Sequence, residues 1–184
     1  MNTNLNSVVF QNGDTIIQAK SSADWKAAFD AGIPAWCYYE NNAKNDKKYG
    51  KLYNWYAVVD SRNVCPVGWR IPNLNDLENL LFNGKTSEEV QMIKDAGDNC
   101  PTCVLGGIDF NYSGSRSSDG SFLGLENILK SDGSSYKRGT TSIWFKLNSS
   151  PGYMSYSDDG NTSNTWWGSV ELDADGHSIR CVKD

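Results

Sequence analysis

Short aromatic segments separated by turn-forming residues occupy the second half of the chain, and they constrain its fold more than any other feature. The segments are Ile108–Tyr112, Ser142–Leu147, Gly152–Tyr156, Thr165–Leu172 and His177–Val182. Clusters of Ser, Asp and Gly lie between or beside them, at 118–120, 131–133, 158–160 and 173–176. Such punctuation is typical of antiparallel strands joined by irregular loops. We therefore predict antiparallel β-structure with long loops after residue 100.

The first half of the chain contains the helical signals. Trp25, Ala28 and Phe29 recur at i, i+3 and i+4, which predicts a short helix between Ser22 and Gly32. Four leucines between positions 74 and 81 form an apolar stripe, and Asn73 or Asn75 can cap the helix that they predict. A further helix is expected over 87–96. Helices before strands indicate an α+β fold rather than alternating βαβ units.

Two other segments of the first half have recognisable patterns. The Asn12–Gly13 pair lies between short apolar runs, which predicts a hairpin turn. The apolar segment Leu52–Val59 is the longest of its kind in the first half, and we interpret it as a strand or another buried segment. The Lys-rich stretch 44–51 is interrupted by Asp46, and we interpret it as a solvated loop.

Length and composition indicate one globular domain, residues 1–184, with an aromatic-rich core or binding face. The chain has seven Trp, nine Tyr, six Phe and 17 Gly. Its net charge of -5 argues against a nucleic-acid partner, because such binding depends on clustered Lys and Arg. No stretch approaches the roughly 20 apolar residues of a membrane span. The polar segment Met1–Ser7 does not resemble a signal peptide.

The chain has five cysteines, so at least one has no intrachain partner. Cys37 lies between aromatic residues and is interpreted as a buried thiol. Cys100 and Cys103 form a single CxxC, for which a structural loop pair is favoured over redox chemistry or metal binding. The redox state of these three cysteines is left open by the sequence.

The single histidine and the acid pairs of this chain favour a noncatalytic protein. His177 is the single histidine, and its position after an Asp-Gly turn predicts a surface hairpin residue rather than a general base. The acid pairs Asp158–Asp159 and Asp173–Asp175 border glycines, so turn formation explains them better than glycoside hydrolysis does. We therefore expect no enzyme activity, no cofactor and no metal site.

Four stretches of the sequence carry a family resemblance. They are Pro34–Tyr39 (PAWCYY), Tyr49–Val58 (YGKLYNWYAV), Cys65–Pro72 (CPVGWRIP) and Ser178–Asp184 (SIRCVKD). Together they resemble the Fibrobacter succinogenes major paralogous domain, which occurs in many secreted and surface proteins of the Bacteroidetes and Fibrobacteres. Because the stretches span nearly the whole chain, the resemblance is to the complete domain.

The resemblance implies a C-type-lectin-like architecture: two helices flanking a small, twisted antiparallel sheet, with long loops and adjacent chain ends. It also implies a disulfide between Cys65 and Cys181, which lie 116 positions apart. The sequence departs from such domains at Ile143–Lys146, where Trp-Trp-Ser-Ser is common. Segment 71–73 also lacks the acid that calcium-binding lectins use, so calcium-dependent sugar binding of that type is not expected.

The second half combines Tyr, Trp, Asn, Ser and Gly, a mixture typical of recognition loops. The candidate ligand-binding residues are Tyr112, Arg116, Trp144, Tyr153, Tyr156, Trp166 and Trp167. The alternative for each is a core position, and it is favoured for Trp144 and for one of Trp166 and Trp167, because strand neighbours point to opposite faces.

These observations favour a recognition or adhesion module that binds a glycan or protein on a cell or virion surface. The absence of a leader in this sequence makes a bacteriophage fibre or decoration protein one version of this hypothesis. The alternative is a structural or assembly domain, as a homo-oligomer or within a virion. An unrecognised enzyme is the third hypothesis. The expected location is extracellular, at the cell surface or on the virion.

Overall fold

A computed structural model describes residues 1, 3–82, 86, 88, 112–129, 135–147, 150–158, 163–169 and 175–184; for 80–82, 125–129, 135–138, 157–158 and 163–169 only the backbone is described. The described part is a mixed α/β structure with four α-helices and small, mainly antiparallel sheets. The helix predicted over 87–96, the segment 108–111, and Cys100 with Cys103 lie outside the described residues. None of the described helices is long and apolar enough to span a membrane.

The N-terminal half supplies the four helices and one small sheet. Its elements are β1 (Ile17–Gln18), α1 (Ser22–Asp30), β2 (Ala35–Cys37), the 3-10 turns η1 (Tyr39–Asn41) and η2 (Ala43–Asn45), α2 (Asp46–Tyr49), β3 (Leu52–Tyr53), α3 (Trp55–Val59), β4 (Trp69–Arg70) and α4 (Leu74–Phe82). In the sheet β1-β2-β3, the first pair is parallel and the second antiparallel.

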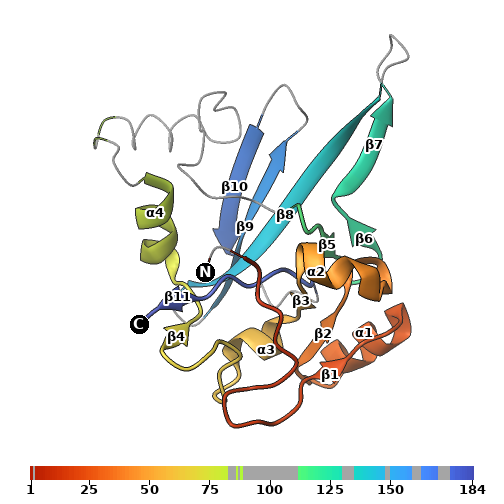
Figure 1. Ribbon diagram of the computed structural model, residues 1–184, viewed down its shortest axis with the longest axis vertical. Coiled ribbons are helices and arrows are strands. Elements are labelled where there is room, and N and C mark those ends of the chain that lie inside the picture. Colours follow the sequence, from red (N-terminus) through yellow and green to blue (C-terminus); the bar gives the residue numbers. More distant parts are fainter. Residues whose placement is uncertain are drawn as a thin grey trace.

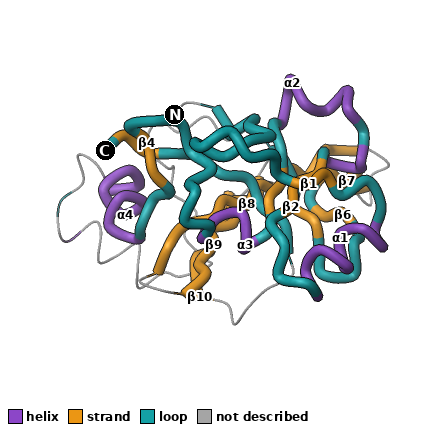
Figure 2. The backbone as a smooth tube through the Cα atoms, turned by 90° about the horizontal axis from the view of Figure 1, so that it is seen from below, coloured by secondary structure: helices purple, strands orange, loops and turns teal. Residues whose placement is uncertain are grey.

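The C-terminal half supplies the larger sheet. Its strands are β5 (Ser115–Arg116), β6 (Phe122–Leu123), β7 (Leu125–Leu129), β8 (Ser135–Leu147), β9 (Ser150–Asp158), β10 (Ser163–Ser169) and β11 (Val182–Lys183). Strands β10-β9-β8-β7 form an antiparallel sheet, while β11 pairs with β4 and β5 with β6. Both views place α4 at one end of the molecule and α1 and α2 at the other, with β8 and β9 between (Figures 1 and 2).

The two principal helices form where the sequence predicts them, and local hydrogen bonds set their first residues. The cap of α1 is Ser21 rather than Ser22, because the Ser21 hydroxyl accepts a hydrogen bond from the Asp24 amide. In α4, Asn73 Oδ1 accepts from the Asp76 amide and Asp76 Oδ2 accepts from the Asn73 amide, at 3.0 and 2.8 Å. This reciprocal pair identifies Asn73 as the cap.

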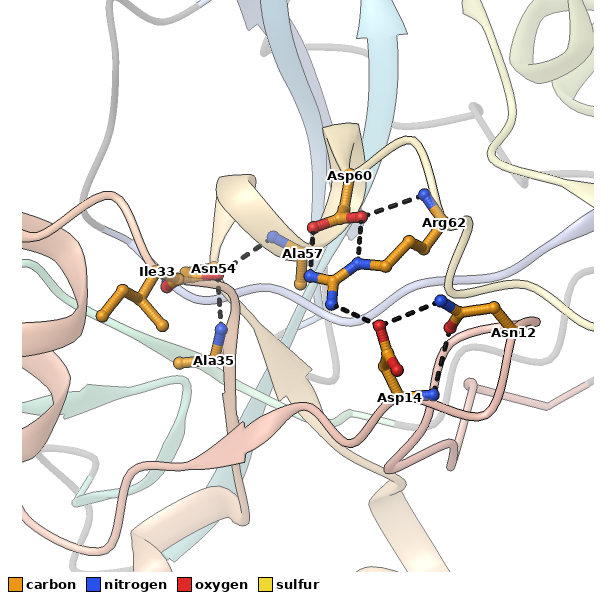
Figure 3. A network of polar contacts seen from close by, with 8 residues as sticks. All are labelled: Asn12, Asp14, Ile33, Ala35, Asn54, Ala57, Asp60 and Arg62. Carbon is orange, nitrogen blue, oxygen red and sulfur yellow. Dashed lines mark hydrogen bonds and ion pairs between the residues drawn. The ribbon is translucent and has the colours of Figure 1, made fainter.

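Of the two interpretations of 52–59, a strand is correct only for Leu52–Tyr53, because the helix α3 begins at Trp55. Asn54 causes the change of structure. Its buried Oδ1 accepts hydrogen bonds from the Ala57 and Ala35 amides, and its Nδ2 donates to the Ile33 carbonyl (Figure 3). The side chain therefore caps α3 and ties it to β2. The segment is buried as predicted, since Trp55, Ala57 and Val58 all belong to the core.

The hairpin predicted at Asn12–Gly13 is confirmed. Val9 and Thr15 form an antiparallel bridge, and the Phe10 amide donates to the Asp14 carbonyl. Gly13 has a φ of +90°, a conformation that glycine adopts without steric cost.

The lysine stretch forms η2 and α2 rather than the predicted loop. The prediction that its lysines are solvated is correct for Lys44, Lys47 and Lys48, which are exposed, but wrong for Lys51. Lys51 is 3% exposed. Its ammonium donates to Asn6 and pairs with Asp46 at 2.8 Å, and it lies 4.9 Å from the Trp36 ring centroid. A buried ammonium is tolerated here because carboxylate, amide and aromatic groups surround it.

The two halves are joined by a central junction made of Tyr53, Trp144, His177 and Ser178. Tyr53 and His177 exchange both backbone hydrogen bonds, and Ser178 accepts from the Trp144 amide and donates to Ser142. The Trp144 indole nitrogen donates to the Tyr53 carbonyl at 2.7 Å. The segment 177–178 is thus hydrogen-bonded to β3 on one side and to β8 on the other.

The Cys65–Cys181 disulfide implied by the family resemblance is present, with a sequence separation of 116. Both cysteines are buried in the main core cluster, which also contains Trp36, Tyr53 and Trp144. The Met1 amino group donates to the Cys181 carbonyl at 2.8 Å, so the two ends of the described chain are adjacent. The disulfide closes a long loop around the central junction.

Removal of this disulfide is expected to destabilise the domain strongly. In the Cys65→Ala/Cys181→Ala variant, the free energy of unfolding should fall by about 3 to 5 kcal/mol, because the unfolded chain gains the entropy of an open loop and the core loses two buried sulfurs. Urea unfolding followed by tryptophan fluorescence measures this change. Cys37→Ala serves as the single-thiol control, and equal stability of the wild type and double variant would contradict the prediction.

Candidate functional site

A cleft of about 700 Å³ opens between α3, the loop that follows it, the start of α4 and the end of β8. This volume lies within the range of small-molecule binding sites. Its lining combines apolar side chains with amides, a hydroxyl and charged groups: Val58, Val59, Asp60, Ser61, Asn63, Arg70, Ile71, Asn73, Leu74, Asn75, Lys146 and Leu147.

Backbone pairing fixes the walls of the cleft relative to one another. The Lys146 amide donates to the Pro72 carbonyl at 2.9 Å, and Asn73 and Lys146 form a parallel bridge. On the other wall, Asn63 Nδ2 donates to the Trp69 carbonyl. Lining residues that are distant in sequence are therefore held on hydrogen-bonded elements, which preorganises the site.

Two of the charged lining residues are committed to internal ion pairs. Arg62 donates from Nε and Nη2 to the two oxygens of Asp60, at 2.8 and 2.7 Å, and its Nη1 reaches Asp14 at 2.9 Å (Figure 3). Arg70 donates to both oxygens of Asp76, at 2.6 and 2.9 Å. Hydrogen bonds from Arg62 lower the pKa of Asp60, and those from Arg70 lower the pKa of Asp76.

These ion pairs limit the chemistry of the cleft. A general acid must hold a proton near neutral pH, whereas the pKa values of Asp60 and Asp76 are shifted in the opposite direction. Ser61, Asn73 and Asn75 are exposed to the cleft and can each donate and accept hydrogen bonds. Val58 and Ile71, in the same lining, are buried apolar residues. The arrangement is suited to binding a small polar group.

Comparison with known families assigns the domain. The family model of the Fibrobacter succinogenes major domain matches residues 1–183. The chain belongs to this family. No curated protein and no solved structure matches it.

The aromatic residues predicted to bind ligand in this Fibrobacter succinogenes major domain fall in different places. Tyr112 and Tyr156 come together, with stacked rings whose centroids are 6.3 Å apart, and both are half-buried. Tyr153 is also half-buried, but it contacts Trp144 and His177 at the central junction. Of these three residues, the structure therefore brings Tyr112 and Tyr156 together and places Tyr153 elsewhere.

Trp166 and Trp167 lie in β10, where the register pairs them with Ser155 and Met154 respectively. Adjacent positions of a strand alternate between its two faces, as expected for these two residues. Their side chains lie outside the described part of the structure, so their role in binding stays a prediction.

The remaining two predicted residues are core residues, and neither presents its side chain to a ligand. Trp144 is 0% exposed and packs against Trp55, in agreement with the core alternative. Arg116 is also 0% exposed, and its guanidinium carbon lies 4.9 Å from the Trp25 ring centroid and 4.8 Å from that of Phe122. The prediction placed Arg116 among the recognition residues of the second half, but its guanidinium packs against these two aromatic rings inside the protein.

The cleft itself was not predicted from the sequence. Its lining comes from segments 58–63, 70–75 and 146–147, which include part of the family motif Cys65–Pro72. The available signal was the concentration of Ser, Asn and Asp on both sides of that motif. Sequence patterns do not show that the end of a distant strand, at Lys146, closes the third wall.

Cys37 and His177 are both buried. Burial raises the pKa of the Cys37 thiol to about 11, so it stays protonated and unreactive near neutral pH. His177 was predicted at the surface, which is wrong: its side chain is 2% exposed and lies 4.4 Å from the ring centroids of both Trp144 and Tyr153. Within the described ranges, no group of three or more His, Cys, Asp or Glu residues is gathered to hold a metal.

Burial lowers the pKa of His177 to about 3, because neither ring nitrogen has a hydrogen-bond partner among the described residues. The unfolded chain has the ordinary histidine pKa of about 6.5, so it binds a proton that the folded state excludes between these two values. The stabilising effect of neutral His177 is complete above pH 6.5 and is lost as the pH falls toward 3.

We therefore expect the free energy of unfolding to fall with decreasing pH below 6.5, by up to about 1.4 kcal/mol per pH unit from this residue. Urea unfolding between about pH 7 and pH 5 measures the slope, above the range in which most carboxylates titrate. The non-titrating variants His177→Gln and His177→Leu should show a shallower slope, whatever their absolute stability. An unchanged slope in both variants would contradict the assignment.

Proposed function

We propose that this Fibrobacter succinogenes major domain is a noncatalytic recognition module that binds a surface ligand, foremost a glycan, through the cleft between α3, α4 and the end of β8. A protein ligand that inserts a small polar group is the second form of the same proposal. The module acts at a cell or virion surface, including the surface of a bacteriophage fibre or decoration protein.

The observation that carries the proposal is the cleft of about 700 Å³, whose lining combines apolar side chains with amides and a hydroxyl. Sugar rings present apolar faces and hydroxyl groups that both donate and accept hydrogen bonds. Ser61, Asn73 and Asn75 can hydrogen-bond the hydroxyls, and the exposed side chain of Val59 offers an apolar contact for a ring face. Because the walls are hydrogen-bonded to one another, little ordering is needed when a ligand enters.

Electrostatics support binding rather than catalysis. The carboxylates nearest the cleft, Asp60 and Asp76, are each held by an arginine in a bidentate ion pair. A nucleophile or general base would have to break one of these pairs. His177, the only histidine of the chain, lies in the core at the central junction. The described polar groups of the cleft are thus suited to hold a ligand rather than to transform it.

The architecture and the cysteines support a surface location. The adjacent chain ends, the helices α1 and α4 on either side of the sheets, and the small antiparallel sheets are consistent with a C-type-lectin-like arrangement, which we propose as the finer fold assignment. The Cys65–Cys181 disulfide is typical of proteins that mature outside the reducing cytosol.

A cleft-filling variant tests the proposed function. Asn75 lies on α4 with an exposed side chain at the cleft, and Asn75→Trp should fill that space and reduce ligand binding by at least about tenfold. Binding is measured on a glycan array and on a panel of intact bacterial cells. Asn79→Trp is the matched control, because Asn79 is exposed on the same helix but does not line the cleft.

Equal loss in both variants would show that the tryptophan disturbs α4 and not the cleft, and circular dichroism checks this. Full binding by Asn75→Trp would reject the cleft as the site. In that case the surface at Tyr112 and Tyr156 becomes the next candidate, tested by Tyr156→Ala. If wild-type protein binds neither glycans nor cells but self-associates in analytical ultracentrifugation, the assembly-domain alternative replaces the recognition function.

A further inference from the structure

Resting on the proposed function, we infer that the cleft selects a saccharide that carries a carboxylate, and that Lys146 is the residue that recognises this group. The family assignment specifies neither the class nor the charge of the ligand. Asp60 and Arg70, the other two charged residues of the described lining, are both held in ion pairs.

Lys146 is held in place by backbone hydrogen bonds, but its ammonium has no carboxylate partner in the part of the chain that the structure describes. Its backbone amide donates a hydrogen bond to the Pro72 carbonyl, and its parallel β-bridge with Asn73 places it next to the residue that caps α4. Its side chain is half-buried and lines the cleft. Among the described residues, no carboxylate lies within ion-pair distance of its ammonium. A half-buried cation without a partner is a favourable place for an anionic ligand group.

The other charged groups of this region are compensated, so they neither compete for the ligand anion nor strongly repel it. The Arg70 guanidinium is occupied by Asp76, with Asp184 at 3.9 Å from its Nε. The Asp60 carboxylate is occupied by Arg62. Asp184 is more than half exposed, so water screens its charge. Among the three charged residues of the described lining, Lys146 is therefore the one whose charge is available to a ligand anion.

The neighbours of Lys146 indicate a sugar as the carrier of the carboxylate. The exposed amides of Asn73 and Asn75 lie in the same lining, beside the Ser61 hydroxyl. These groups can form hydrogen bonds with ring hydroxyls, while the ammonium can form an ion pair with a carboxylate on the ring's exocyclic carbon. A uronic acid residue combines both features, and a neutral hexose supplies only the first.

Isothermal titration calorimetry with trigalacturonate and its fully methyl-esterified form tests the inference, because esterification removes the charge and keeps the sugar skeleton. The wild-type domain should bind the acid at least about tenfold more tightly than the ester. Lys146→Met should lose that preference while its weaker binding of the ester is unchanged, and Lys146→Arg should retain the preference. Added salt should weaken binding of the acid.

Lys47→Met is the matched control, since it removes one exposed lysine on α2 and changes the net charge equally. Thermal unfolding confirms that each variant is folded. Equal binding of acid and ester by the wild type, or binding of neutral saccharides alone, would overturn the carboxylate inference and leave the proposed function standing. If Lys47→Met also lost the preference for the acid over the ester, that preference would be an effect of net charge and not of Lys146. Failure to bind any saccharide would overturn both the carboxylate inference and the glycan form of the proposed function, and only its protein-ligand form would then stand.

Discussion

The hydrogen bonds of the segment 177–178 to two different sheets are the interaction on which the rest of the structure depends. His177 pairs with Tyr53 of β3, and Ser178 pairs with Trp144 and Ser142 of β8. The Trp144 indole closes the junction by donating to the Tyr53 carbonyl. Helices and strands from opposite halves of the chain share one core here, because a single returning segment satisfies backbone groups on both sides of it.

The same returning segment also builds the cleft. After Ser178 the chain reaches Cys181, bonded to Cys65, and then β11, which pairs with β4. Strand β4 leads through Pro72 into α4, and the end of β8 is hydrogen-bonded at Pro72. The walls of the cleft therefore belong to the rigid frame rather than to free loops. A recognition site placed in this way keeps its shape before a ligand arrives, which reduces the entropic cost of binding.

Sequence patterns predicted elements whose signals are local. The amphipathic spacing around Trp25 and the capping residue Asn73 were sufficient for α1 and α4, and Gly13 was sufficient for the hairpin. The family resemblance implied the disulfide correctly. Patterns failed where contacts with residues distant in sequence decide the local structure or the burial of a side chain. Asn54 caps α3 and is hydrogen-bonded to β2, so a strand-like segment becomes a helix. Aromatic rings from other segments pack against Arg116 and His177, which are therefore buried.

The sequence by itself determined the family, the class of fold, the principal helices and the residues that cross-link the chain, because propensity, spacing and motif act over short ranges. Only the tertiary structure decided which polar side chains face solvent. A lysine or arginine in a polar stretch has the same local pattern whether it is exposed, as Lys44 is, or enclosed by carboxylate and aromatic groups, as Lys51 is. Burial depends on segments far away in the chain. The cleft depends on them too, because Lys146 lines it together with segments 58–63 and 70–75.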